Sequence, residues 1–116
     1  DKPNVAVVSS NGIEVDLHLG RAKQFLIYGP RQDGLTCLLE ARRAPAPGKG
    51  NNRWNEVSHL LEDCFVLLAA SAGEAPRTTL SKKGLQVVIT EENIEGTVDA
   101  LYGGGKKGKK KERNPN

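Results

Sequence analysis

The residue best suited to metal binding or catalysis in this sequence is His18, which lies in a glycine-flanked stretch between two apolar segments. A neutral imidazole ligates iron and other transition metals, and it also accepts and donates protons. Ser10 and Asn11, two small polar residues in the turn before this stretch, add hydrogen-bonding groups. Most isolated histidines are surface or structural residues, so on the loop alone that alternative stays open.

Three strands are expected in the first half of the chain, over residues 5–9, 24–28 and 35–42. The first two flank the His18 loop and must position it. In the third, Leu35, Cys37 and Leu39 share one face, because side chains alternate along a strand. We therefore interpret Cys37 as a packing residue and not as a metal ligand. The segment 44–52 is rich in proline and glycine and is expected to be a loop.

Helices alternate with strands in the second half of the chain. The first helix can be capped by Asn52, and its apolar side comprises Trp54, Val57, Leu60, Leu61 and Cys64. His59 points away from that side and is expected to be solvated. Strands at 65–70 and 85–89 enclose a second helix with Pro76 in its first turn. A third helix is expected to be capped by Asn93, and its residues Ile94, Val98 and Leu101 are expected to face the core.

This order predicts an α/β protein with a ribonuclease-H-like three-layer fold, built from a mixed five-stranded sheet and three helices. If the first strand rises, the second descends and the others rise. The His18 loop, the 44–52 loop and the turn at 71–76 then meet at one end of the sheet. Ligands of open α/β sheets bind outside the carboxyl ends of parallel strands, which is this end. Cys64 precedes its strand and falls at the opposite end, which argues against a ligand pair with His18.

The expected ligand end also carries groups that attract anions. The N–H groups at the start of the helix after Gly73 favour negative charge, and Arg77 lies in its first turn. Lys49, Arg42 and Arg43 border the 44–52 loop. The residues that we predict to contact a ligand here are His18, Ser10, Asn11, Gly73, Arg77 and Lys49.

Three groups of residues, in order along the chain, form a recognisable set. They are Val5-Ala-Val-Val-Ser-Ser with His18-Leu-Gly and Phe25-Leu-Ile-Tyr28, then Asp63-Cys64 with Gly73-Glu-Ala-Pro-Arg77 and Gly84-Leu-Gln-Val-Val88, then Ile94-Glu-Gly-Thr-Val-Asp-Ala-Leu-Tyr102. In order and spacing they resemble the dinitrogenase iron–molybdenum cofactor biosynthesis family over residues 5–28 and 60–102. Leu19 stands where that family usually has phenylalanine, and Ala72 where it often has isoleucine.

The resemblance implies a domain that binds or carries the iron–molybdenum cofactor, or its iron–sulfur precursor, during nitrogenase cofactor biosynthesis. It implies His18 as the metal ligand, nitrogenase assembly proteins as partners, and no catalysis by this chain. One protein ligand suits temporary holding of such a cluster. A protein–protein interaction module with the same fold and no cluster binding is the alternative. A metal-dependent nuclease is disfavoured, because the first strand supplies no carboxylate for Mg²⁺.

The charge of the chain is concentrated at its C-terminal end. Residues 103–116 hold six of the seventeen Lys and Arg residues and one of the fourteen acidic ones, so residues 1–102 carry a net −2 although the whole chain carries +3. We expect one domain over 1–102 and a disordered basic tail over 103–116. No aromatic residue interleaves the lysines, so nucleic-acid binding is not expected. No apolar run approaches the ~20 residues of a membrane span, and a cytoplasmic location is the default expectation.

Deleting residues 104–116 is expected to leave folding intact, because this segment has no apolar side chains to bury. The melting temperature followed by circular dichroism should fall by no more than about 2 °C, the shift that roughly 0.5 kcal/mol causes in a domain of this size. A larger drop would show that the segment packs against the domain.

Overall fold

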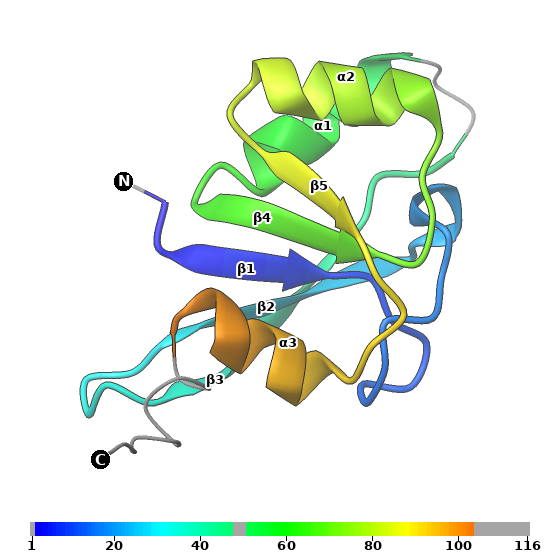
Figure 1. The fold of residues 1–116 in the computed structure, drawn as a ribbon. Helices are drawn as coiled ribbons and strands as arrows, with labels where there is room; N and C mark the ends of the chain where they lie inside the picture. The colour runs from blue at the N-terminus through cyan, green and yellow to red at the C-terminus, as the bar shows by residue number, and fades with distance from the viewer. Residues whose placement is uncertain (1, 48–50, 104–116) are drawn as a thin grey trace.

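The computed structural model describes residues 2–47 and 51–103 (Figure 1). In chain order its elements are β1 (Asn4–Val7), the 3-10 helix η1 (Leu19–Arg21), β2 (Gln24–Pro30), β3 (Thr36–Arg43), α1 (Asn51–Leu60), β4 (Cys64–Ala69), α2 (Glu74–Lys82), β5 (Gln86–Ile89) and α3 (Ile94–Leu101). The predicted α/β architecture with five strands and three α-helices is confirmed. The ribonuclease-H-like assignment stays a prediction. Apart from Gly103, the predicted basic tail lies outside the described residues.

The five strands form one mixed sheet in the order β3-β2-β1-β4-β5. β2 runs antiparallel to both of its neighbours, β1 and β3. β1, β4 and β5 are parallel to one another. These directions agree with those expected from the order of elements, and they bring the carboxyl ends of the three parallel strands to the same edge of the sheet.

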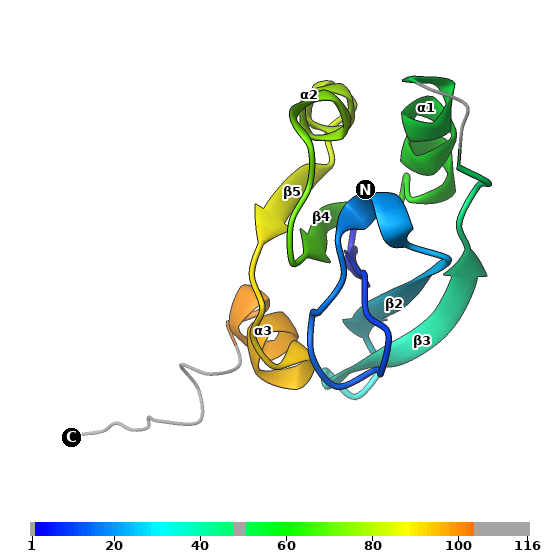
Figure 2. The same ribbon diagram turned by 90° about the vertical axis from the view of Figure 1, so that its right-hand side faces the viewer.

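Helices cover both faces of the sheet, which gives three layers (Figure 2). α1 and α2 pack on one face, against Ala6 and Val8 of the β1 segment. α3 packs on the other face, against Val5 and Val7. β1 and β4 are therefore buried on both sides, which explains why both are continuous apolar runs in the sequence. None of the helices in the described segments is long and apolar enough to cross a bilayer.

The edge strand β3 is largely exposed, contrary to the packed apolar face expected from its alternation. A bulge opposite Ile27 and Tyr28 breaks the alternation. Leu39 lies close to Gly29, where an added Cβ atom would come within 2.8 Å of the leucine Cδ1 atom. Leu35 and Leu39 nevertheless remain 63% and 45% exposed. Cys37 is half-buried.

The start of α1 and the burial of Leu101 differ from the sequence-based prediction. α1 begins at Asn51, so Asn52 lies inside the helix, where its Nδ2 atom donates to Glu56 Oε2 at 3.2 Å instead of capping. α3 ends at Leu101, which is 36% exposed instead of buried. Tyr102, which is half-buried, packs against the core instead, with its ring edge-on to Phe65 and 5.8 Å between ring centroids.

An ion pair ties β3 to the start of β4. Arg42 Nη1 donates to Asp63 Oδ1 and Arg42 Nη2 donates to Asp63 Oδ2, both at 2.8 Å. Arg42 Nη1 also donates to the Leu60 carbonyl at 2.9 Å, and Asn4 Nδ2 donates to Asp63 Oδ2 at 2.9 Å. These hydrogen bonds, that from Arg42 above all, hold the pKa of Asp63 well below its ordinary value despite partial desolvation. The expectation that Arg42 serves the ligand end is therefore wrong, since its guanidinium is engaged elsewhere.

Replacing Asp63 with Asn is expected to destabilise the domain near neutral pH by about 1 kcal/mol, or roughly 5 °C in melting temperature. The estimate is modest because 34% of the Asp63 side chain is exposed and solvent screens the pair. Because folding lowers the pKa of Asp63, its contribution is present above about pH 4 and is lost as pH falls further. Thermal melts of both proteins should therefore converge in acid.

Asp33→Asn provides the matched control, because its ion pair with Arg31 joins side chains that are 44% and 55% exposed. This control should melt within about 2 °C of the parent at all pH values. A gap between the parent and Asp63→Asn that stayed constant from pH 7 to pH 2 would contradict the assignment of the effect to ionised Asp63.

Cys64 is a core residue and is the first residue of β4, whereas the sequence-based prediction placed it on the apolar side of α1. Burial raises the pKa of its thiol to about 12, with a further contribution from neighbouring Asp63. The thiolate is the form of cysteine that binds metals and reacts with disulfides. Cys64 also pairs with Asn4, at the amino end of β1, so the prediction that it lies away from the His18 end is confirmed.

Ellman's reagent should therefore modify one thiol per folded chain at pH 8, at the half-buried Cys37. Cys64 should react only after guanidinium unfolds the domain, because burial keeps its thiol protonated and covered. In a Cys37→Ser variant, the native protein should show almost no fast reaction. Rapid modification of this folded variant would mean that Cys64 is accessible.

Candidate functional site

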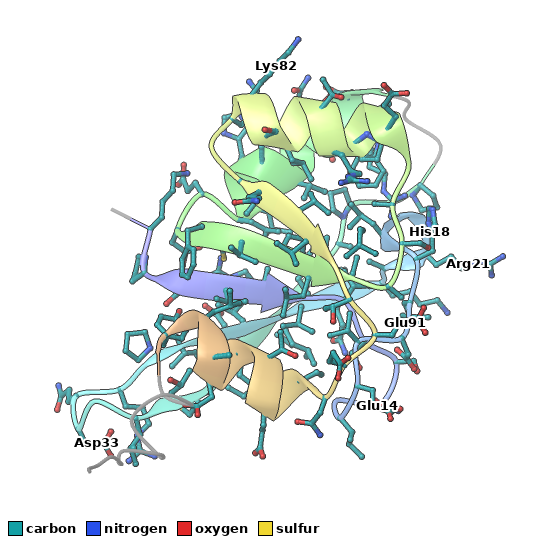
Figure 3. The ribbon with its side chains drawn as sticks, in the orientation of Figure 1. Glu14, His18, Arg21, Asp33, Lys82 and Glu91 are labelled. Atoms are coloured by element: carbon teal, nitrogen blue, oxygen red, sulfur yellow. The ribbon has the colours of Figure 1, made fainter. Side chains whose placement is uncertain are left out.

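His18 lies at the carboxyl ends of β1 and β4, beside the segment that leads into α2 (Figure 3). It forms a parallel β-bridge with Ser71. Leu19 N donates to the Ser71 carbonyl at 2.8 Å, and Ala70 N donates to the Leu17 carbonyl at 2.9 Å. The loop after β1 and the segment after β4 therefore run side by side. This confirms the expectation that His18 and the 71–76 turn lie at one end of the sheet.

The imidazole of His18 is exposed and caps η1. Its Nδ1 atom accepts a hydrogen bond from Gly20 N at 2.9 Å, so the proton of the neutral ring is on Nε2. Ligation through Nδ1 would use the lone pair that accepts this bond, and ligation through Nε2 by a neutral ring requires the proton to move to Nδ1. Either mode of metal binding gives up the Gly20 hydrogen bond.

Ser10 and Asn11 belong to the turn that opens the His18 loop. Ser10 donates to Asp16 from both its backbone N–H, at 2.8 Å, and its hydroxyl. The Asn11 Oδ1 atom accepts from the backbone N–H groups of Ile13 and Glu14 at 2.8 and 3.0 Å. The side-chain oxygen of Asn11 is thus occupied in shaping the turn, whereas Ser10 also lines a groove described below.

Arg53 of α1 holds the backbone around η1. The sequence-based prediction did not include it among the functional residues. It is only 6% exposed. Its Nη1 atom donates to the Gly20 carbonyl at 2.9 Å and its Nη2 atom to the Ala22 carbonyl at 3.4 Å. Its guanidinium also lies 4.8 Å from the centre of the Trp54 ring, a cation–π contact. The helical period offered a signal, because Arg53 precedes the buried Val57 by four residues.

A groove of about 1150 Å³ opens between the segment from η1 to β2 and the segment that follows β3. Three exposed cations line it, Arg21, Lys23 and Arg43, together with Ser9 and Ser10. No Asp or Glu is among its described lining residues. Arg43 is a cation that the sequence analysis placed near this end, whereas Arg21 and Lys23 are additions from the structure.

Acidic residues lie on the opposite side of the same end. Glu14 forms an antiparallel bridge with Asn93 at the start of α3, and Val15 N donates to the Glu92 carbonyl at 3.1 Å. The side chains of Glu14, Glu91 and Glu92 are exposed. Figure 3 shows Glu14 and Glu91 on the α3 side of His18. The end of the sheet is therefore divided into an acidic side near α3 and a basic side near β3.

The remaining predicted ligand residues do not converge on the groove. Gly73 is the N-cap of α2 and follows the Ser71 bridge closely, so it is near His18. Arg77 is exposed on α2 and lines another hollow, between α2 and β5, together with Glu74 and Lys82. Lys49 lies outside the described residues. Within the described ranges, no three His, Cys, Asp or Glu side chains are grouped as a metal site.

Comparisons with known proteins identify the family of this chain and several relatives. Residues 2–104 match the family model described as "Dinitrogenase iron-molybdenum cofactor". The chain is 38% identical over 103 residues to FeMo cofactor biosynthesis protein NifB of Chlorobaculum tepidum, covering 88% of this chain and 24% of that protein. It is 26% identical over 117 residues to Protein NifX of Klebsiella pneumoniae, covering 96% of this chain and 75% of NifX.

The fold is also found among solved structures. The crystal structure of the protein PH0822 superposes with a TM-score of 0.67 at 18% sequence identity, over 87% of this chain and 91% of that one. This likeness concerns the fold. The chain spans about a quarter of the NifB protein that it matches. Because the family model extends over almost all of the chain, the protein belongs to the dinitrogenase iron–molybdenum cofactor family.

Proposed function

We propose that this domain holds the iron–molybdenum cofactor, or its iron–sulfur precursor, as cargo during nitrogenase cofactor biosynthesis. The observation that carries the proposal is the exposed imidazole of His18, presented at the carboxyl ends of two parallel strands in a chain of this family. Imidazole is a suitable ligand for iron, and open α/β sheets bind ligands at this edge. The domain acts as a holder and not as a catalyst of cluster synthesis.

His18 is the proposed metal ligand, and the other predicted residues assist it in different ways. Ser10 lines the neighbouring groove and can face the cargo directly. Asn11 acts indirectly, because its side chain fixes the turn before His18. Backbone N–H groups after Gly73 favour an anionic cargo at the start of α2. Arg77 would contribute only positive charge at longer range, and Lys49 stays a predicted contact.

The similarity to NifX and to part of NifB supports partners among the nitrogenase assembly proteins. A second candidate function, an interaction module without cluster binding, is favoured by the apolar edge around β3. Leu35 and Leu38 are 63% and 51% exposed there. The two functions differ in one measurable property, which is the affinity of the isolated domain for a cluster.

His18→Ala is expected to weaken binding of the iron–sulfur precursor cluster by about 10- to 100-fold, the usual effect of losing a metal ligand or its support. Anaerobic titration followed by the visible absorption of the cluster measures the affinity. The circular-dichroism spectrum and melting temperature should stay close to those of the parent, because the His18 side chain is exposed and makes one local hydrogen bond.

His59→Ala is the matched control, since His59 is an exposed histidine in the last turn of α1. It should bind the cluster as tightly as the parent. If His18→Ala also did so, ligation by this residue would be wrong. If the parent itself bound no cluster, the interaction module would become the better account of the domain.

A further inference from the structure

The basic groove lined by Arg21, Lys23 and Arg43 concentrates positive charge that no ion pair among the described residues neutralises. The ion pairs in the described part of the chain join Arg31 to Asp33 and Arg42 to two acidic residues, and none includes a groove cation. Like charges held close together repel one another, which costs stability unless an anion joins them. The positive charge of the groove does not reflect the charge of the whole domain, because residues 1–102 carry a net −2.

One wall of the groove is held in place by a buried cation. Arg53 donates to the carbonyls of Gly20 and Ala22, the two residues that flank Arg21. Its Nε atom is buried and has no hydrogen-bond partner among the described residues. The buried Arg53 donates to carbonyl groups and contacts the Trp54 ring, and no ion pair among the described residues includes it. Arg53 therefore fixes the backbone that carries Arg21 and adds a positive potential that solvent screens weakly.

The other wall is tied to the first through the backbone. Ala44 N donates to the Lys23 carbonyl at 2.9 Å, and Arg43 pairs with Gln24 across the antiparallel strands β2 and β3. Arg21 ends η1, Lys23 precedes β2 and Arg43 ends β3, so the register of β2 with β3 fixes where Lys23 and Arg43 lie. No aromatic side chain is among the described residues that line the groove, so it offers no platform for stacking nucleic-acid bases.

From this arrangement we propose that the basic groove is a binding site for sulfur-rich metal anions, such as thiometalates and the anionic face of a metal–sulfur cluster. The inference deepens the proposed function and rests on it for the identity of the natural cargo. Arg21 and Arg43 donate N–H groups to sulfide ligands, and Lys23 adds a mobile positive charge. Recognition by charge in this groove is separate from ligation by His18.

Tetrathiomolybdate, MoS₄²⁻, tests the groove without a cluster, because its metal is already saturated by four sulfides and has no open position for imidazole. Titration into ¹⁵N-labelled protein should shift the amide signals of residues 20–24 and 41–44. The double variant Lys23→Ala with Arg43→Ala should bind this anion about tenfold more weakly, because two charged contacts are lost. Raising salt should weaken the parent more than this variant.

Lys82→Ala with Lys83→Ala removes the same charge from the far end of α2, away from His18 (Figure 3), and serves as the control. It should bind tetrathiomolybdate within twofold of the parent. Equal weakening in this control would overturn the proposal, since binding would then follow net charge alone. Shifts absent from the groove would overturn it as well.

Two further measurements separate the groove from the proposed function. His18→Ala should keep its affinity for tetrathiomolybdate while losing affinity for the precursor cluster. If the groove variant bound both the cluster and tetrathiomolybdate like the parent, the groove proposal would fail and cluster binding by His18 would stand. If the parent bound tetrathiomolybdate in the groove but no cluster, the groove would stand and the proposed function would fail.

Discussion

The parallel pairing of β1 with β4 is the constraint on which the arrangement of this domain depends. The pairing runs from Asn4 with Cys64 to Val7 with Leu68, in the centre of the sheet. Both strands are buried on both faces, and each fully buried Val or Leu side chain contributes roughly 1.5–3 kcal/mol. Since the two strands end at the same edge, the segments that leave them must meet there. The position of His18 thus rests on the most heavily buried part of the core.

The charges at that edge are divided in a way that would orient the approach of an anionic ligand. The acidic side chains of Glu14, Glu91 and Glu92 border the α3 side, and the basic groove borders the β3 side. An anion that approaches His18 is repelled from one side and attracted to the other. The net charge of the domain would not have revealed this division, because the two sets nearly cancel in a sum.

The general arrangement could be predicted from sequence because it follows from short-range patterns. Continuous apolar runs indicated the central strands, and strand direction then placed the His18 loop at the same end of the sheet as the 71–76 turn, which the bridge between His18 and Ser71 confirms. The roles of individual cations could not be predicted in the same way. Arg42 and Arg43 are neighbours in sequence, but strand alternation sends their side chains to opposite faces. Only Arg42 reaches Asp63, a partner 21 residues away.

Arg53 shows a second limit of sequence-based prediction. The helical period places it on the buried side of α1, but a charged residue is assigned to the interior only when its partners are known. Those partners are the backbone carbonyls of Gly20 and Ala22, which carry no side-chain signal in the sequence. The exposure of Leu101 was missed for a related reason, since the ring of Tyr102 occupies the space beside Phe65.

The hydrogen bond from Gly20 N to His18 Nδ1 has a consequence for how tightly His18 would hold a metal in the proposed function. The amide N–H of Gly20 would compete with a metal, because the neutral ring can bind a metal only after this hydrogen bond is broken. One such bond is worth ~1 kcal/mol, which lowers the affinity for metal about fivefold. In the proposed function, the same amide would bind the ring again when a cargo departs. Such replacement of the leaving metal would favour handover to a tighter-binding acceptor over long-term storage.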